Sequence, residues 1–232
     1  MSSLIIEAVK KNLDISQNVP LKISVFEAFK KTIVLGDIPA GQRINEKEFS
    51  DVLNISRTPI RFALKELEKE KLVDHLPRIG VVVKGISRKD AVEIFEIRKS
   101  LDTLATIQAM EKMTDEDFHE MDLLLQRGEE DSRHDRIDEV LQNFTDFNAF
   151  IYQKSQMVRL AAIVTQLQAY LLYFRNISIR SSKRRQIALD EHRLIYRGMK
   201  NKNIEQITLI THEHLDRSLI FILSEMERRQ ID

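Results

Sequence analysis

Residues 55–73 have the sequence ISRTPIRFALKELEKEKLV, which has the spacing of an amphipathic helix. Ser56 suits the N-cap position, and Pro59 lies in the first turn, where a missing backbone N–H costs little. The apolar residues that recur at core spacing are Ile60, Ala63, Leu64 and Leu67. Other faces near the start of this helix are basic and hydroxylated. The segment therefore predicts a helix with one buried face and a positively charged N-terminal half.

The flanking residues extend this helix into a small domain. A first helix is predicted to end at Gly36, and Asn45 with Glu48 fits a capping pair for a short second helix through Leu53. After residue 73, two β-rich runs flank the four-residue turn Pro77–Gly80 and predict a hairpin. The order of helix, helix, turn, helix and hairpin is typical of a winged helix-turn-helix.

The second half of the chain has a different pattern. Most Gly and Pro residues lie in the first 85 positions, whereas only Gly128 and Gly198 occur later. From Ser87 onward every segment has helical period, with helices predicted at about 115–131, 137–155, 157–177, 183–200 and 204–230. The predicted fold is mainly α: a winged helix-turn-helix in residues 1–85 and an antiparallel all-α bundle in residues 86–232.

Composition excludes several classes of protein. The 232 residues are 43% hydrophobic and 31% charged, with zero net charge and no cysteine, which excludes disulfides and thiolate metal sites. No apolar run approaches the ~18 residues of a membrane span, and the N-terminus lacks the features of a signal peptide. We therefore expect a cytoplasmic protein that does not enter the membrane.

The start of the helix in residues 55–73 has the chemistry of a DNA-reading surface. The second helix of a helix-turn-helix places its N-terminal residues in the major groove, where arginine bonds guanine and hydroxyl groups hold phosphates. Ser56, Arg57, Thr58 and Arg61 meet this need. The alternative is that Ser56 only caps the helix and the arginines only form a solvated face.

Three motifs in order resemble the winged-helix domain of the GntR family of regulators. They are G-x-x-P-x-G-x-x-I-x-E at residues 36–46, the segment 55–73, and PRIGVVV at residues 77–83. This resemblance implies contacts with operator DNA from Lys47, Ser56, Arg57, Thr58, Arg61 and Gly80. The chain departs from the family pattern at Lys71, where glycine is usual.

The helical half resembles the FCD effector domain of the FadR-type branch of this family. The resemblance rests on residues 93–105, 147–155 and 190–203, and on His214. Many FCD domains bind a divalent metal through an Asp and a His four residues apart and two further His residues. Here His192 and His214 match the last two ligands, but Phe144 and Asn148 occupy the first two positions. The resemblance thus implies an incomplete site in which Asn148, His192 and His214 hold zinc, nickel or manganese with help from water or effector. The alternative is that the two histidines are hydrogen-bonded core residues.

A buried organic anion needs a cation, and the fork of arginine bonds a carboxylate at two points. Arg98 matches the effector-contacting arginine of the family, and Arg175 is a second candidate. The alternative for Arg98 is a simple salt bridge to Asp102, one turn further along the helix. These residues predict a small organic acid as the effector.

The function predicted from these features is ligand-responsive transcriptional regulation. A homodimer would read a short inverted repeat of operator DNA, and repression is favoured over activation. One rival is a protein-interaction module whose winged helix grips a protein. A helical-bundle metalloenzyme is the other rival, but the chain lacks HExxH, paired Glu-x-x-His motifs and a nucleophile elbow, so we expect no enzyme.

Overall fold

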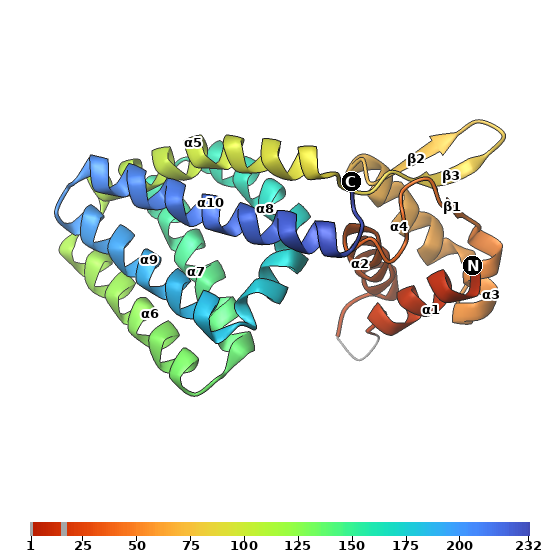
Figure 1. The fold of residues 1–232 in the computed structure, drawn as a ribbon, viewed down its shortest axis with the longest axis horizontal. Helices are drawn as coiled ribbons and strands as arrows, with labels where there is room; N and C mark the ends of the chain where they lie inside the picture. The colour runs from red at the N-terminus through yellow and green to blue at the C-terminus, as the bar shows by residue number, and fades with distance from the viewer. Residues whose placement is uncertain (1, 15–17) are drawn as a thin grey trace. The chain divides into compact units, whose positions relative to one another are not determined.

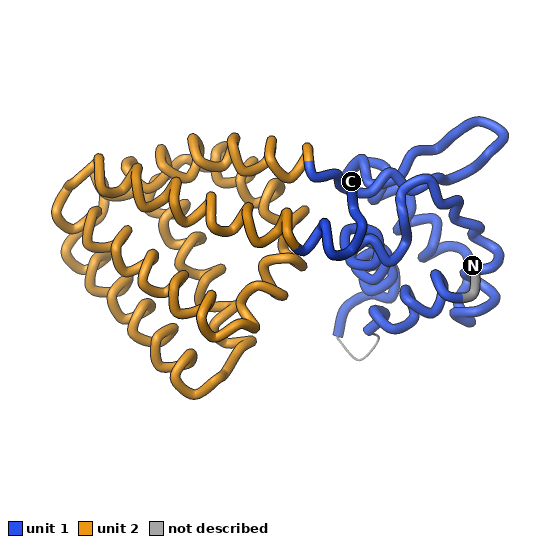
Figure 2. Tube along the Cα trace, in the orientation of Figure 1, with its two compact units in different colours: residues 1–88, 225–232 blue, residues 89–224 orange. Residues whose placement is uncertain are grey.

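The structure is a computed structural model that describes residues 2–14 and 18–232. The chain forms two compact units, coloured separately in Figure 2. The first contains residues 1–88 together with 225–232, and the second contains residues 89–224. The sequence predicted a boundary between residues 85 and 86 and placed residues 225–232 in the helical half. In the structure these last residues belong to the first unit.

The first unit is a helical domain with a small three-stranded sheet (Figure 1). Its elements are α1 (Ser2–Asn12), α2 (Leu21–Val34), β1 (Arg43–Ile44), α3 (Glu46–Leu53), α4 (Arg57–Lys69), β2 (Val73–Leu76) and β3 (Gly80–Val83). The antiparallel strands are ordered β1-β3-β2, and Val82 pairs with both Arg43 and Asp74. Because Gly80 is already part of β3, three residues connect β2 to β3 instead of the four predicted. The winged helix-turn-helix is confirmed.

Local sequence explains the ends of the two central helices. The Asn45 side chain caps α3 by accepting from the backbone N–H of Lys47, and its amide donates to Glu48 at 3.2 Å. This confirms the predicted capping pair. Ser56 occupies the N-cap of α4, although its side chain makes no capping hydrogen bond to the described residues. The four apolar residues predicted for the buried face of α4 are all buried.

Two elements of the first unit were not predicted. In α1, Ile5, Ile6 and Val9 are buried, and Asn12 donates a hydrogen bond of 3.0 Å to Thr32 on α2. β1 is only two residues long, which is too short for an alternating pattern to identify. Both elements depend on packing partners far along the chain.

The second unit is built from helices throughout its described residues, as the sequence predicted. The helices are α5 (Arg88–Lys112), α6 (Asp115–Arg133), α7 (Ile137–Ser155), α8 (Val158–Ile179), α9 (Ser182–Lys200) and α10 (Ile204–Arg228), with the first residue of α5 and the last turn of α10 in the first unit. Helix α6 packs against α7 and α9, and α8 packs against the same two helices. No described helix has the length and apolar character that a membrane span requires.

The C-terminal segment packs on the end of α2 within the first unit. The Arg229 guanidinium donates to the carbonyl of Leu35 at 3.3 Å, and the backbone N–H of Arg88 donates to the carbonyl of Asp232 at 3.1 Å. An added Cβ at Gly36, where φ is +76°, would lie 2.8 Å from a side-chain carbon of Ile231. These contacts explain why residues 225–232 belong to the first unit.

Lys71 follows α4 at a position that favours glycine. Helix α4 ends in a Schellman motif, with the N–H of Lys71 bonded to the carbonyl of Glu68 and the N–H of Leu72 bonded to the carbonyl of Leu67. Lys71 therefore adopts φ = +58°, a left-handed conformation that strains a residue with a Cβ atom.

We expect Lys71→Gly to raise the free energy of unfolding by about 1 kcal/mol, because it relieves this strain. Urea denaturation measures the change. The matched control is Glu68→Gly, which places glycine at an exposed helical position and should lower stability by about 1 kcal/mol. A loss of stability in both variants would contradict the proposed strain at Lys71.

Gly128 on α6 has no room for a side chain. A Cβ atom there would overlap the amide oxygen of Asn143, a side chain whose Nδ2 donates a 2.7 Å hydrogen bond to the carbonyl of Leu124 and so holds the amide in place. We expect Gly128→Ala to lower the free energy of unfolding by roughly 1 to 3 kcal/mol through overpacking. Thermal unfolding tests this in a double-mutant cycle, in which the same change should cost less in the Asn143→Ala background. Equal costs in both backgrounds would rule out the overlap as the cause.

Candidate functional site

The N-terminal end of α4 presents an exposed basic and hydroxylated surface. Ser56, Arg57 and Thr58 are all exposed, and the Ser56 hydroxyl is not used as a helix cap. The first backbone N–H groups of a helix have no partner within the helix and attract anions. This end of α4 can therefore bind phosphate groups as well as read bases.

The other residues predicted to contact DNA lie on neighbouring elements of the same unit. Lys47 is exposed in the first turn of α3, and Gly80 begins β3 with φ = +98°. Arg61 is exposed on α4 but forms an ion pair of 2.7 Å with Glu46. An exposed pair of this kind is worth less than about 1 kcal/mol, so a phosphate or a base can replace the carboxylate.

A groove of about 380 Å³ lies between α4 and the β2–β3 hairpin, and it adds basic residues that the sequence analysis missed. Lys65 and His75 line it with Arg61. Arg43, whose Nε lies 3.7 Å from the Cβ position at Gly80, and Arg78, in the turn of the hairpin, are also exposed. The signal that could have found them is their basic character in the segments next to the recognised motifs.

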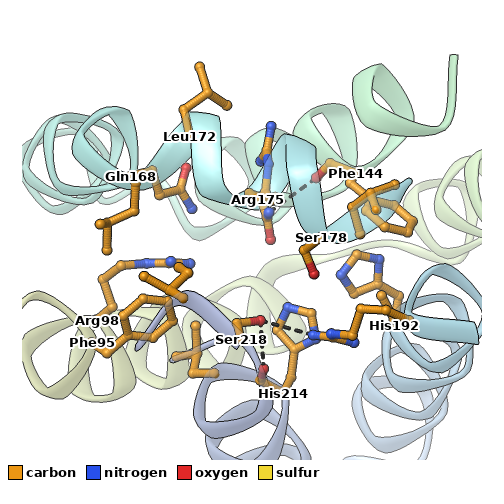
Figure 3. A pocket seen from close by; sticks show the side chains of 17 residues that line it. Phe95, Arg98, Phe144, Gln168, Leu172, Arg175, Ser178, His192, His214 and Ser218 are labelled. Carbon is orange, nitrogen blue, oxygen red and sulfur yellow. Dashed lines mark hydrogen bonds between the residues drawn. The ribbon is translucent and has the colours of Figure 1, made fainter. Parts of the chain in front are cut away.

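The second unit contains a cavity of about 60 Å³ that is lined from five helices (Figure 3). Every candidate residue that the sequence named for effector or metal lies on its wall, namely Arg98, Asn148, Arg175, His192 and His214. The apolar wall includes Phe95, Phe144, Leu171, Leu215 and Ile222. The cavity thus combines an apolar lining with a small number of cationic groups.

Arg98 reaches the cavity from α5 but already has an acidic partner. Its guanidinium donates to Asp102 at 2.9 Å, and both side chains are nearly buried. Asp102 also accepts from the hydroxyl of Tyr152 at 2.8 Å, and that hydroxyl accepts from Gln168 at 2.8 Å. Burial and the charge of Asp102 raise the pKa of Tyr152 well above its usual value, so its hydroxyl stays protonated and donates. The salt bridge that the sequence left as an alternative for Arg98 is present, and the residue also lines the cavity.

Arg175 on α8 differs from Arg98 because it has no acidic partner in the described chain. Its guanidinium donates to the hydroxyl of Thr145 at 3.0 Å, while its buried Nε has no hydrogen-bond partner among the described residues. Burial and the nearby charge of Arg98 lower the pKa of Arg175 to about 10. Arg175 remains charged at neutral pH and carries a donor group that is ready for an anion.

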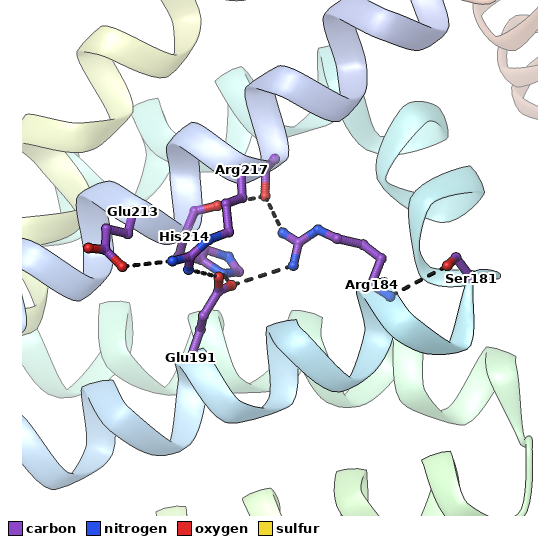
Figure 4. A network of polar contacts seen from close by, with 7 residues as sticks. Ser181, Arg184, Glu191, Glu213, His214 and Arg217 are labelled. Atoms are coloured by element: carbon purple, nitrogen blue, oxygen red, sulfur yellow. Dashed lines mark hydrogen bonds and ion pairs between the residues drawn. The ribbon is translucent and has the colours of Figure 1, made fainter.

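A buried carboxylate, Glu191, joins α9 to α10 (Figure 4). It lies 2.6 Å from Nδ1 of His214, accepts from Arg217 and lies 3.5 Å from Arg184. Burial alone would raise the pKa of Glu191, but the hydrogen bonds from His214 and Arg217 and the charge of Arg184 outweigh it and hold the pKa at about 2. Glu191 is therefore ionised and fixes the orientation of the His214 ring.

His192 lies between aromatic rings. Its ring stacks on Phe147 with centroids 4.3 Å apart and contacts the edge of Phe144 at 4.7 Å. Its Nδ1 is buried with no hydrogen-bond partner among the described residues. Burial and the neighbouring ring of His214, 5.0 Å away, lower the pKa of His192 well below its usual value, so this ring is neutral.

The side chains at this site do not fit a divalent metal. Phe144 fills the place where the family has its acidic ligand, and its ring contacts His192. The amide of Asn148 donates to the carbonyl of Phe144, and Glu191, the nearest carboxylate, is committed to His214 and two arginines. The described residues contain no group of three or more His, Cys, Asp or Glu side chains placed to hold a metal. The metal site predicted at Asn148, His192 and His214 thus lacks a free carboxylate: its donors are one amide and two imidazoles, and the guanidinium groups of three arginines line the same cavity.

Sequence reasoning missed the polar residues that complete the cavity. Arg184 donates to the hydroxyl of Ser218 at 3.0 Å, and both residues line the cavity wall with Gln168. On α9, Glu191 comes directly before His192 and seven residues, about two helical turns, after Arg184. This spacing places Glu191 and Arg184 on the same face of the helix, and it was the signal by which the sequence could have identified them.

Comparison with known proteins identifies both units. A model for bacterial regulatory proteins of the gntR family matches residues 21–83, and a model for the FCD domain matches residues 93–217. The chain is 27% identical to YdhC, an HTH-type transcriptional regulator of Bacillus subtilis (strain 168), over 80% of this chain and 84% of that protein. It is 25% identical to the gluconate operon transcriptional repressor of Bacillus licheniformis, over 79% of this chain and 77% of the repressor.

A solved structure shows the same fold. The structure of McbR/YncC from E. coli superposes with a TM-score of 0.64 at 21% identity, covering 89% of this chain and 98% of that one. The matched family models and relatives are transcription regulators and not enzymes. The chain belongs to the gntR family of bacterial transcriptional regulators, with a DNA-binding winged helix-turn-helix and an FCD domain.

Proposed function

We propose that this regulator binds operator DNA through the exposed end of α4 and changes its affinity when a small organic acid enters the cavity of the helical unit. The observation that carries the proposal is Arg175, a charged guanidinium on the cavity wall without an acidic partner in the described chain. A buried charge without a partner is costly, so an anion that binds there gains a strong, charge-assisted interaction.

In the proposed complex with DNA, Arg57 and Arg61 read base edges from α4. Ser56, Thr58 and Lys47 hold phosphates, and Gly80 lets the hairpin backbone approach the DNA closely. A homodimer places two such helices on a short inverted repeat, whose half-site spacing is fixed by the dimer. Because operators lie in the bacterial cytoplasm, the proposal places the protein there.

Ligand control requires that the acid bind one arrangement of the two DNA-binding units better than another. Arg98 and Arg175 are proposed to contact the acid from α5 and α8. Repression is the proposed direction of control, supported by the name of the gluconate operon repressor among the relatives.

Arg57→Ala should weaken operator binding by roughly 5- to 150-fold, because one bidentate arginine–guanine contact is worth roughly 1 to 3 kcal/mol. Fluorescence anisotropy measures this on DNA that the wild-type protein selects from a random pool. The control is Lys69→Ala, which removes an exposed cation from the other end of α4 and should leave affinity unchanged. Unchanged affinity in Arg57→Ala with an intact melting temperature would refute this DNA surface.

A thermal-shift screen of the chelator-treated protein against small carboxylates tests the effector. At an acid concentration of a hundred times Kd, binding should raise the melting temperature by roughly 5 to 10 °C. Parallel samples with added zinc, nickel or manganese should show the same shift. If no carboxylate stabilises the protein with or without these metals, an organic-acid effector is refuted.

A further inference from the structure

The charge of the cavity follows from the partners of four arginines: Arg98, Arg175 and Arg184 on its wall, and Arg217, which shares Glu191 with Arg184. Arg98 is balanced by the buried carboxylate of Asp102 at 2.9 Å. Two carboxylates balance the charges of Arg184 and Arg217. Glu191 contacts both arginines, and Glu213 pairs with Arg217 at 2.8 Å. His192 is neutral.

Arg175 is the remaining guanidinium on this wall, and the described chain offers it no carboxylate. The binding site as a whole therefore has one positive charge that is not neutralised. A ligand with one negative charge would neutralise it, whereas a ligand with two would leave one buried charge without a partner.

Size and polarity further restrict the ligand. The enclosed volume of about 60 Å³ corresponds to roughly four to six water-sized groups, since one such group needs about 10–15 Å³. Around the arginines the wall is mostly apolar, with Phe95, Leu171 and Ile222 among its residues, and its hydroxyl and amide groups are few. Because the apolar part of the wall leaves hydroxyl groups without hydrogen-bond partners, a polyhydroxylated acid is disfavoured.

Building on the proposed function, we infer that the cavity binds a short-chain monocarboxylate with an apolar body, held at its carboxylate by Arg175 and without a metal ion. The carboxylate lies against the free Nε–H side of Arg175, while the hydrocarbon body packs on the apolar wall. In this chain, Glu191 and its cationic partners occupy the place of a metal and hold His214 in position.

Arg175 lies on the walls of two neighbouring spaces. Arg175, Gln168 and Leu172 line both the cavity and a neighbouring groove of about 430 Å³ on the α7 and α8 side. Thr145, which accepts the hydrogen bond from Arg175, lies in the groove. The acid enters by this side and meets Arg175 before it reaches the apolar wall.

Three four-carbon probes separate the charge classes at nearly constant size: butyrate carries one charge, succinate two, and butyramide none. Isothermal titration of the chelator-treated full chain at neutral pH should give a Kd for butyrate at least tenfold below the Kd for succinate or butyramide. Gluconate, a polyhydroxylated monoanion, should bind as weakly as succinate. Added zinc should leave the Kd for butyrate unchanged.

Variants test the charge count directly. Arg175→Gln should raise the Kd for butyrate at least tenfold, and Arg175→Lys, which keeps the charge, should recover part of the loss. Arg180→Gln is the matched control, because it removes an exposed arginine at the end of the same helix and should have no effect. Asp102→Asn keeps an acceptor for Tyr152 but frees the charge of Arg98, so it should lower the Kd for succinate about tenfold.

The outcomes distinguish this inference from the proposed function. Tighter binding of succinate or gluconate than of butyrate, a requirement for zinc, or unchanged butyrate binding in Arg175→Gln would overturn the inference while leaving an organic-acid effector in place. If none of the acids binds in the titration or in the wider thermal-shift screen, both the inference and the proposed effector fail. A melting temperature near that of the wild type shows that each variant is folded.

Discussion

The organisation of the helical unit depends on one buried carboxylate, that of Glu191. It is 3% exposed and is shared by His214 and Arg217 of α10 and Arg184 of α9. Loss of one partner from a buried ion pair typically costs 3–5 kcal/mol, because the remaining charge has no compensation. The cations therefore keep Glu191 ionised, and Glu191 in turn sets the position of the His214 ring beside the cavity.

The two histidines that the sequence assigned to a metal are held by contacts within the chain. A divalent metal gains most from carboxylate and imidazole ligands that are free to coordinate. Here Phe144 packs on His192, and the carboxylate of Glu191 already bonds Nδ1 of His214. Ring packing holds His192, and the ion pairs around Glu191 hold His214. The group that remains available to bind a ligand is the guanidinium of Arg175, which suits an anion.

Local signals predicted most of the fold, because turns, caps and apolar periodicity act over a few residues. The start of α4, the capping of α3 and helices α6 to α10 followed from such patterns, and the ends of α6 to α10 lie within about two residues of those predicted. Packing between distant segments decided the rest. Helix α1 gains its burial from α2 and α3, and Ile231 packs on Gly36 although 195 positions separate them. The cavity shows the same division: Arg98, Arg175 and the pairing of Arg98 with Asp102 could be recognised along single helices, whereas the lack of a carboxylate beside Arg175 in the described chain depends on how several helices pack.

Helix α10 is a covalent connection between the cavity and the DNA-binding unit, because it lines the cavity and its last residues belong to the first unit. It contributes His214, Ser218 and Ile222 to the cavity wall, and from Glu225 onward the chain belongs to the first unit. Within that unit Arg229 bonds the carbonyl of Leu35 at the end of α2, which packs against α4. A ligand can alter DNA affinity only by the difference in its binding energy between two states. Helix α10, which carries cavity residues from its middle onward and leads directly into the segment that bonds Leu35, is therefore a physical element on which that difference can act.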